Sequence, residues 1–125
     1  MATNNRYTPA EYNTGIVRGD FFTETFTFSI DNLPFDVNTA NSHIQIRSLA
    51  DGFNPSIIGS VLGDYSDGNG LIHENNSIIW EIEDTETATF IPGVYSYDLE
   101  LIIDNRPKTY VRGRFTVEND ITQKI

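Results

Sequence analysis

Few residues in this chain have a type and spacing that suggest chemistry. The two histidines, His43 and His73, stand in different elements and lack the short spacing of a metal-binding pair. No nucleophile elbow accompanies them, so the sequence gives no support for a hydrolase built on Ser, His and an acid. We therefore expect both histidines at the surface or at a sheet edge.

The segment 63–70, GDYSDGNG, contains oxygen ligands of the kind that Ca²⁺ prefers, from Asp64, Asp67 and Asn69. An EF-hand loop counted from Asp64 needs an acidic ligand at the position of Asn75. Because asparagine occupies that position, the spacing fails. We predict a polar hairpin turn instead of a calcium site.

Four carboxylates gather where one predicted strand ends. They are Glu81, Glu83, Asp84 and Glu86. A general acid and base would need two of them in contrasting environments, whereas a strand end places all of them in water. We therefore predict a solvated edge.

Arg18, Gly19 and Asp20 form the tripeptide that binds integrins when a flexible loop displays it. Here the tripeptide comes directly before a strand rich in phenylalanine. We expect Gly19 to supply a bend and Asp20 to begin the strand. The sequence thus assigns no catalytic, cofactor-binding or metal-binding residue, and it predicts a protein that is not an enzyme and needs no cofactor.

Composition narrows the class of protein further. The 125 residues carry a net charge of −10 and no cysteine, which excludes disulfides and thiolate metal sites. Phosphate backbones repel such a surface, so we expect no nucleic-acid partner. Neither a secretory h-region nor an apolar run of membrane-spanning length occurs in the sequence, and we expect no membrane association.

Alternation of apolar and polar residues predicts strands along most of the chain. The segments that show it best place one set of apolar side chains on a single face. These inward sets are Phe22, Phe26, Phe28 and Ile30; Ile44 and Ile46; Ile78, Trp80 and Ile82; Tyr95, Tyr97, Leu99, Leu101 and Ile103; and Val111, Phe115 and Val117. Trp80 is expected to be a core aromatic between two sheets.

Turn residues separate these strands, at 31–38, 51–55, 63–70 and 104–107. Only 83–93 allows a helical turn, which Pro92 and Gly93 would end. We predict an all-β fold, an antiparallel β-sandwich of about seven or eight strands. The domain would cover 15–119, with a polar N-terminal arm at 1–14 and a C-terminal tail at 120–125.

The segments RGDFFTETFTFSI, HIQIRS, IIWEI, TATFIPGVYSYDLELI and YVRGRFTVEND follow one another in that order. Their order and spacing resemble the immunoglobulin-like module of tailed-bacteriophage structural proteins, typified by the N-terminal domain of siphophage baseplate upper proteins. The resemblance extends from about Ile16 to Asn119. Its sharpest positions are Pro92, Gly93, Tyr95, Tyr97, Asp98, Leu99 and Gly113.

This resemblance implies a noncatalytic virion component, a tail, baseplate or neck adaptor that is made in the host cytoplasm and assembles with other virion proteins and with itself. A capsid decoration or head-fibre protein is the alternative within that class. The net charge predicts a partner with a basic or strongly polar face, and we expect at least one terminal arm to add to a neighbour's sheet edge. The resemblance also implies that the Tyr95 hydroxyl bonds to nearby backbone.

A carbohydrate- or surface-binding module is the rival class. Sandwiches of this kind often use exposed aromatic platforms to bind sugars. The candidate platform residues are Tyr7, Tyr12, Phe53, Tyr65 and Tyr110.

Overall fold

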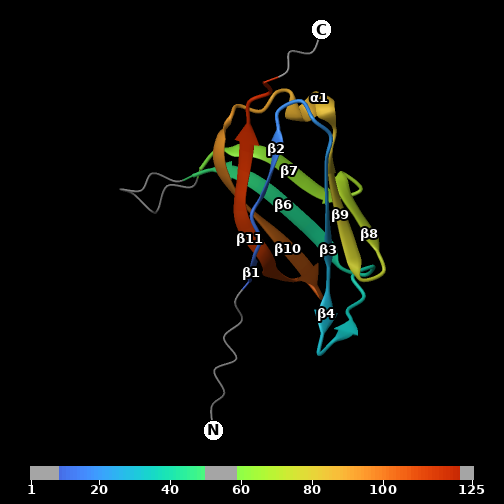
Figure 1. Cartoon of the computed structure of the whole chain (residues 1–125). Coiled ribbons are helices and arrows are strands. Elements are labelled where there is room, and N and C mark those ends of the chain that lie inside the picture. The colour runs from blue at the N-terminus through green and yellow to red at the C-terminus, as the bar shows by residue number, and fades with distance from the viewer. Residues whose placement is uncertain (1–8, 50–58, 122–125) are drawn as a thin grey trace.

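The computed structural model describes residues 9–49 and 59–121 of the chain. Strands make up most of that part, and a single short helix joins two of them (Figure 1). The elements are β1 (Ala10–Glu11), β2 (Thr14–Val17), β3 (Phe22–Thr27), β4 (Ser29–Ile30), β5 (Leu33–Pro34), β6 (Asn41–Ser48), β7 (Val61–Asp67), β8 (Gly70–Glu74), β9 (Ser77–Ile82), α1 (Asp84–Thr87), β10 (Gly93–Ile103) and β11 (Arg106–Glu118).

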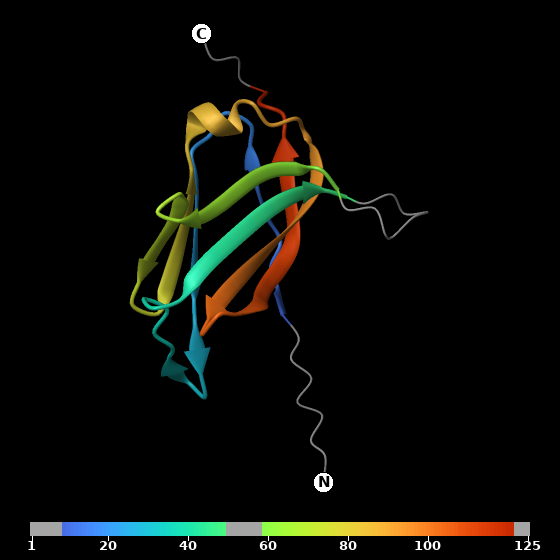
Figure 2. The same ribbon diagram turned by 180° about the vertical axis from the view of Figure 1, so that it is seen from behind.

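The strands follow the order β1-β11-β10-β6-β7-β8-β9-β3, and β2 also pairs with β11. The hydrogen-bonded path bends at the turn between β7 and β8, so that β8, β9 and β3 form a layer facing β11, β10 and β6 (Figures 1 and 2). Most pairs are antiparallel, whereas β1 and β2 run parallel to β11. The fold is therefore an all-β sandwich, as the alternation predicts, and the immunoglobulin-like arrangement is the one that the resemblance implies.

The core lies between the two layers, where the inward side chains of each strand meet. Trp80 is fully buried at its centre. Its ring contacts those of Phe22, Phe26, Tyr65, Tyr97 and Phe115. The prediction of a core tryptophan is confirmed, and so are the predicted inward positions on β6 and β9.

The prediction for Ile30 is wrong. Phe28 is buried, but Ile30 is 58% exposed. The chain leaves the main sheet after β3, and β4 pairs only with β5 in a separate two-stranded ribbon. The alternation of apolar and polar residues therefore continues into β4, although β4 no longer faces the core. This hairpin projects from the end of the sandwich opposite α1 (Figure 1).

Two hairpins turn on pairs of residues with positive φ. Asp31 and Asn32 join β4 to β5, and Asp104 and Asn105 join β10 to β11. Asp and Asn tolerate this left-handed region better than most residues, and two of them in succession form the tight turn that suits the twist of a hairpin. The turn predicted at 104–107 is confirmed. The predicted turn at 51–55 falls outside the described residues.

The segment between β9 and β10 also follows the sequence prediction. It contains the single helical turn α1, after which Pro92 and Gly93 lead into β10. The Tyr95 hydroxyl donates a hydrogen bond to the Ile91 carbonyl, which is the backbone contact that the resemblance implies. Within the described residues, no helix has the length and apolar character needed to cross a membrane.

The described part of the predicted N-terminal arm lies within the sandwich. Ala10 and Glu11 pair with Val111 and Arg112 of β11. The Tyr12 amide donates to the Arg112 carbonyl at 2.9 Å. Within the described residues, the strand pairing on this side begins at Ala10.

Candidate functional site

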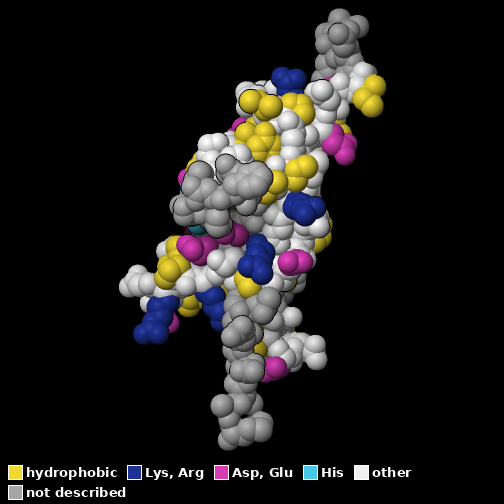
Figure 3. All heavy atoms as spheres, turned by 90° about the vertical axis from the view of Figure 1, so that its left-hand side faces the viewer, with side chains coloured by type: hydrophobic (Ala, Val, Ile, Leu, Met, Phe, Trp, Pro, Cys, Tyr) yellow, Lys and Arg dark blue, Asp and Glu magenta, His cyan; other side chains and the backbone are white. Residues whose placement is uncertain are grey.

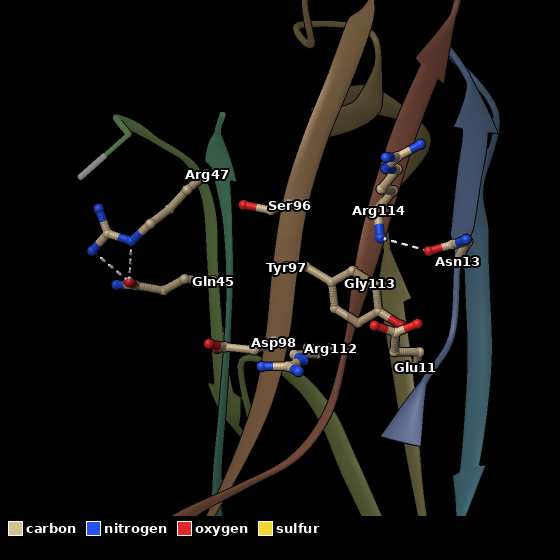
Figure 4. A pocket seen from close by; sticks show the side chains of 10 residues that line it. All are labelled: Glu11, Asn13, Gln45, Arg47, Ser96, Tyr97, Asp98, Arg112, Gly113 and Arg114. Carbon is tan, nitrogen blue, oxygen red and sulfur yellow. Dashed lines mark hydrogen bonds between the residues drawn. The ribbon is translucent and has the colours of Figure 1, made fainter. Parts of the chain in front are cut away.

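A shallow groove of about 620 Å³ lies on the outer face of β11, β10 and β6, beside β1 (Figure 4). The register of the strands arranges its side chains in two rows across the sheet. Arg114, Ser96 and Arg47 form the first row. Arg112, Asp98 and Gln45 form the second row. Because these residues are on the face opposite the core, strand alternation turns all six toward solvent.

The first row has an arginine on each side and a serine between them. Neighbouring strands lie about 4.8 Å apart, so Arg114 and Arg47 are separated by roughly twice that distance at the backbone, with only the Ser96 side chain between them. A small residue between two long ones leaves a hollow. Basic and acidic side chains lie close together on this side of the molecule (Figure 3).

Arg47 is held in place by uncharged oxygens. Its Nε and Nη2 donate to Gln45 Oε1 at 3.1 and 2.7 Å, and its Nη1 donates to the Gly59 carbonyl at 2.7 Å. A guanidinium has five N–H donors, so two remain after these three bonds. Among the described residues, no carboxylate lies within 4.0 Å of this guanidinium, so its positive charge is fixed by neutral acceptors.

Asp98 lies in the second row, directly opposite Arg112. The two side chains do not form an ion pair, since the ion pairs within 4.0 Å in the described part of the chain join His43 to Asp64 and His73 to Asp67. Figure 4 shows the Asp98 carboxylate turned toward β6. Partial desolvation raises the pKa of Asp98, and the nearby charges of His43 and Arg47 oppose that shift.

Asp64 extends the second row onto β7. It accepts hydrogen bonds from Gln45 Nε2 at 3.0 Å and contacts His43 Nε2 at 2.6 Å. The hydrogen bond from Gln45, helped by His43, lowers the pKa of Asp64. The carboxylate is therefore held ionised at the side of the groove.

The wall of the groove beside β1 depends on a close approach of two backbones. A Cβ at Gly113 would lie 2.0 Å from the Tyr12 carbonyl oxygen, so only glycine fits there. The buried Tyr97 hydroxyl donates to the same carbonyl at 2.6 Å. Asn13 Oδ1 accepts from the Arg114 amide at 2.9 Å. These contacts set the position of β1 and thus the width of the groove.

The two histidines have different surroundings. His43 is partly exposed on the outer face of β6, in line with the sequence prediction. His73 is not a surface residue, because its side chain is only 11% exposed. Its Nδ1 contacts the Val37 carbonyl at 2.8 Å, and its Nε2 contacts Ser42 Oγ at 2.6 Å.

Ser42, His73 and Asp67 thus lie together, although no spacing in the sequence predicts that grouping. Asp67 Oδ1 accepts from the Ser42 amide at 2.6 Å and from Ser42 Oγ at 2.8 Å. In a catalytic triad the acid bonds to the far ring nitrogen of the histidine, but here that nitrogen contacts the Val37 carbonyl. Ser42 is also buried. The cluster therefore joins β6, β7 and β8 and has no exposed nucleophile.

The three oxygen-bearing residues of the segment 63–70, for which the sequence predicts no calcium site, make other contacts. Asp64 faces His43 and Gln45, and Asp67 faces Ser42 and His73. Asn69 lies in the turn between β7 and β8, where its amide donates to the Ser66 carbonyl at 2.8 Å. Residues 9–49 and 59–121 bring together no group of three His, Asp or Glu side chains arranged to hold a metal ion.

The four predicted edge carboxylates lie around the start of α1, and one of them has a specific contact. Glu86 accepts a hydrogen bond from the Tyr65 hydroxyl at 2.5 Å. Burial, followed in importance by Glu86, raises the pKa of Tyr65. Glu81, Glu83 and Glu86 line a separate small hollow of about 280 Å³.

The Arg18-Gly19-Asp20 tripeptide forms the predicted bend before β3. Gly19 has a φ of 90°. Arg18 Nε donates to the Ala88 carbonyl at 3.0 Å, and the Asp20 carbonyl accepts from Thr87 Oγ1 at 2.7 Å. These contacts attach the tripeptide to α1 rather than displaying it on a free loop.

The candidate aromatic platform does not form a single surface. Tyr65 is buried in the core, whereas Tyr12 and Tyr110 line a second groove, of about 460 Å³, between β1 and β3. The Tyr12 hydroxyl donates to Glu24 Oε1 there at 3.1 Å. Tyr7 and Phe53 lie outside the described residues.

The similarity of this chain to known proteins is a similarity to solved structures. No protein-family model matches the chain, and no curated protein matches it. An uncharacterised protein from Bacillus anthracis str. Ames has a similar structure, with 15% identity and a TM-score of 0.46 over 90% of this chain and 85% of that one.

A family 123 glycoside hydrolase from Clostridium perfringens, whose structure addresses glycolipid glycan hydrolysis, matches at 17% identity and a TM-score of 0.40. The match covers 92% of this chain but only 24% of the hydrolase. At these identities and TM-scores, neither similarity carries an argument about function.

Proposed function

We propose that this protein is a noncatalytic structural component of a tailed-phage virion, a small tail, baseplate or neck adaptor that acts by assembling with other virion proteins and with copies of itself. The resemblance of its strand segments to the immunoglobulin-like module of phage structural proteins supports this role. Its all-β sandwich is compatible with the same module.

The observation that carries the proposal is the position of exposed apolar side chains at both ends of the sandwich. At the end that carries α1, Ile91 is 71% exposed, and Phe21 and Val94 are also exposed. At the opposite end, the β4–β5 hairpin exposes 58% of Ile30 and 68% of Leu33. Figure 3 shows hydrophobic side chains gathered at the upper end, and Figure 1 shows the hairpin at the lower end.

Scattered single apolar residues are normal on a protein surface, but groups at defined places indicate contact with other proteins. Groups of this kind lie at the two ends, although Leu49, Val61 and Ile72 are also exposed elsewhere, while the outer face of β11, β10 and β6 carries charged and polar side chains. A protein with apolar groups at both ends can contact one neighbouring protein at each end. Contact at both ends is what an adaptor requires.

Mass spectrometry and immunogold labelling of purified particles test this role. We expect the protein in the virion at a fixed copy number, and its absence from particles would overturn the proposal. A map of the intact particle then separates a tail, baseplate or neck position from the alternative of a capsid decoration or head-fibre protein.

A further inference from the structure

We propose that the groove on β11, β10 and β6 binds a saccharide that carries one carboxylate, such as a uronic acid unit. This inference concerns a lateral face of the isolated chain, and it is independent of the contacts at the two ends. Of the aromatic side chains that the sequence suggested for sugar binding, the described ones (Tyr12, Tyr65 and Tyr110) do not line this groove.

The first step is the excess of unneutralised positive charge. Arg47, Arg112 and Arg114 line the groove, although the whole chain has only eight Lys and Arg against eighteen Asp and Glu. Among the described residues, none of these three guanidiniums lies within 4.0 Å of a carboxylate. A planar guanidinium matches a carboxylate with two parallel hydrogen bonds, so an anionic group on a ligand would find donors here.

The second step is the groove's polar lining. The aromatic ring of Tyr97 is buried beneath it. Ser96, Asn13 and Asp98 present hydroxyl, amide and carboxylate groups along it, whereas the Gln45 amide is engaged by Arg47 and Asp64. Such groups exchange hydrogen bonds with the hydroxyls of a sugar. A volume of about 620 Å³ accommodates a small saccharide.

The third step limits the charge of the ligand. Asp98 and Glu11 lie in the same groove as the three arginines. They disfavour a phosphate dianion, and the net charge of −10 repels polyanions from the whole molecule. A single carboxylate surrounded by hydroxyls meets both conditions.

The test compares two ligands that differ only in the carboxylate. Methyl glucuronide and methyl glucoside are titrated into the ¹⁵N-labelled full-length protein, and amide shifts are followed by NMR. We expect the glucuronide to shift the amides of 96–98 and 112–114, and to bind about tenfold more tightly than the glucoside. Equal binding of the two sugars, or no shift of these amides at millimolar ligand, would overturn the proposal.

Two variants with the same change of charge on the same strand make the result specific. Replacing Arg112→Gln and Arg114→Gln together should weaken glucuronide binding by about tenfold or more. Replacing Arg106→Gln and Lys108→Gln, which lie outside the groove, should leave binding nearly unchanged. All four residues are exposed, so both variants should keep the amide spectrum of the folded protein. Equal weakening in both variants would show that binding depends only on the net charge of the protein, and it would refute the site.

Two small anions distinguish recognition of the carboxylate alone from recognition of the whole sugar acid. Acetate supplies the carboxylate without the sugar, and inorganic phosphate supplies an oxyanion of higher charge. Both should bind more weakly than the glucuronide. Acetate binding as tight as that of the glucuronide would refute recognition of the sugar, and tighter phosphate binding would refute selection for a carboxylate.

Discussion

Two tyrosine hydroxyls of β10 bind backbone carbonyls of neighbouring segments and hold those segments against the sandwich. Tyr95 bonds to the Ile91 carbonyl after α1, and Tyr97 bonds to the Tyr12 carbonyl beside β1. In both cases a ring on β10 holds a backbone carbonyl of another segment. The hairpin that looks devoid of chemistry in the sequence therefore has a structural task, which is to anchor these segments.

Replacing Tyr95→Phe tests the first of these anchors. The ring remains, and only the hydrogen bond to the Ile91 carbonyl is lost. We expect the free energy of unfolding to fall by about 1 kcal/mol. Urea denaturation measures the change, and a midpoint equal to that of the unmodified protein would contradict the role of the hydroxyl.

The raised pKa values of Tyr65 and Tyr97 predict that the free energy of unfolding falls at alkaline pH. Burial raises the pKa of both phenols above the ordinary value of 10.0. The unfolded chain releases these protons near pH 10.0, but the folded chain retains them. Stability that is fully present below that pH should therefore fall above it, by about 1.4 kcal/mol per pH unit for each phenol.

Denaturation at pH values on either side of 10.0 measures this slope. Replacing Tyr65→Phe removes one of the two protons, so the slope should become shallower whatever the variant's stability at neutral pH. Identical slopes for the variant and the unmodified protein would rule out Tyr65 as a source of the alkaline loss.

At the scale of the elements, the parallel pairing of β1 with β11 shapes the groove. Gly113 permits this pairing, because any Cβ there would collide with the Tyr12 carbonyl. Replacing Gly113→Ala should push β1 away from β11 and lower the free energy of unfolding by about 1 to 3 kcal/mol. Hydrogen exchange should also show faster exchange of the Tyr12 amide, whose acceptor is the Arg112 carbonyl.

Gly68→Ala provides the control for this experiment. Gly68 has a positive φ of 76°, so alanine is strained there, but nothing lies within 4 Å of its missing Cβ. The control should lower stability without selectively exposing the Tyr12 amide. Unchanged exchange of that amide in the Gly113 variant would show that β1 tolerates a side chain at the contact.

At the scale of the whole molecule, the two apolar ends predict how assembly fails. Replacing Ile30→Lys and Leu33→Lys changes exposed side chains of the β4–β5 hairpin, so the free energy of unfolding should change by less than about 0.5 kcal/mol for each. Incorporation into particles should nevertheless fall strongly, because a charged side chain is costly to bury in a contact.

Complementation of a phage that lacks the gene, followed by quantitative mass spectrometry of the particles, measures incorporation. Thr23→Lys and Thr25→Lys on the exposed side of β3 add the same charge outside the β4–β5 hairpin. Normal incorporation of the hairpin variant, or equal loss in both variants, would contradict a role for the ends.

The sequence by itself determined the class of fold, because alternation and turn chemistry are local. The inward positions of Ile44, Ile46 and Trp80 follow from period two alone, and the turn at Asp104 and Asn105 follows from residues that accept positive φ. Local rules failed at Ile30, where the alternation continued but the opposing layer ended.

Only the tertiary structure decided which polar residues meet. Gln45, Asp98 and Arg112 form one row because β6 pairs with the β10–β11 hairpin, which lies far from it in the chain, and no spacing in the sequence encodes the register of that pairing. The same holds for Ser42, Asp67 and His73, which come from three strands. Outward alternation marked each of the groove residues as solvent-facing, but a groove is a property of neighbouring strands. The physical reason is that the alternation of buried and exposed residues depends on neighbours within one strand. The residues of a site come from different strands and meet only when those strands pair.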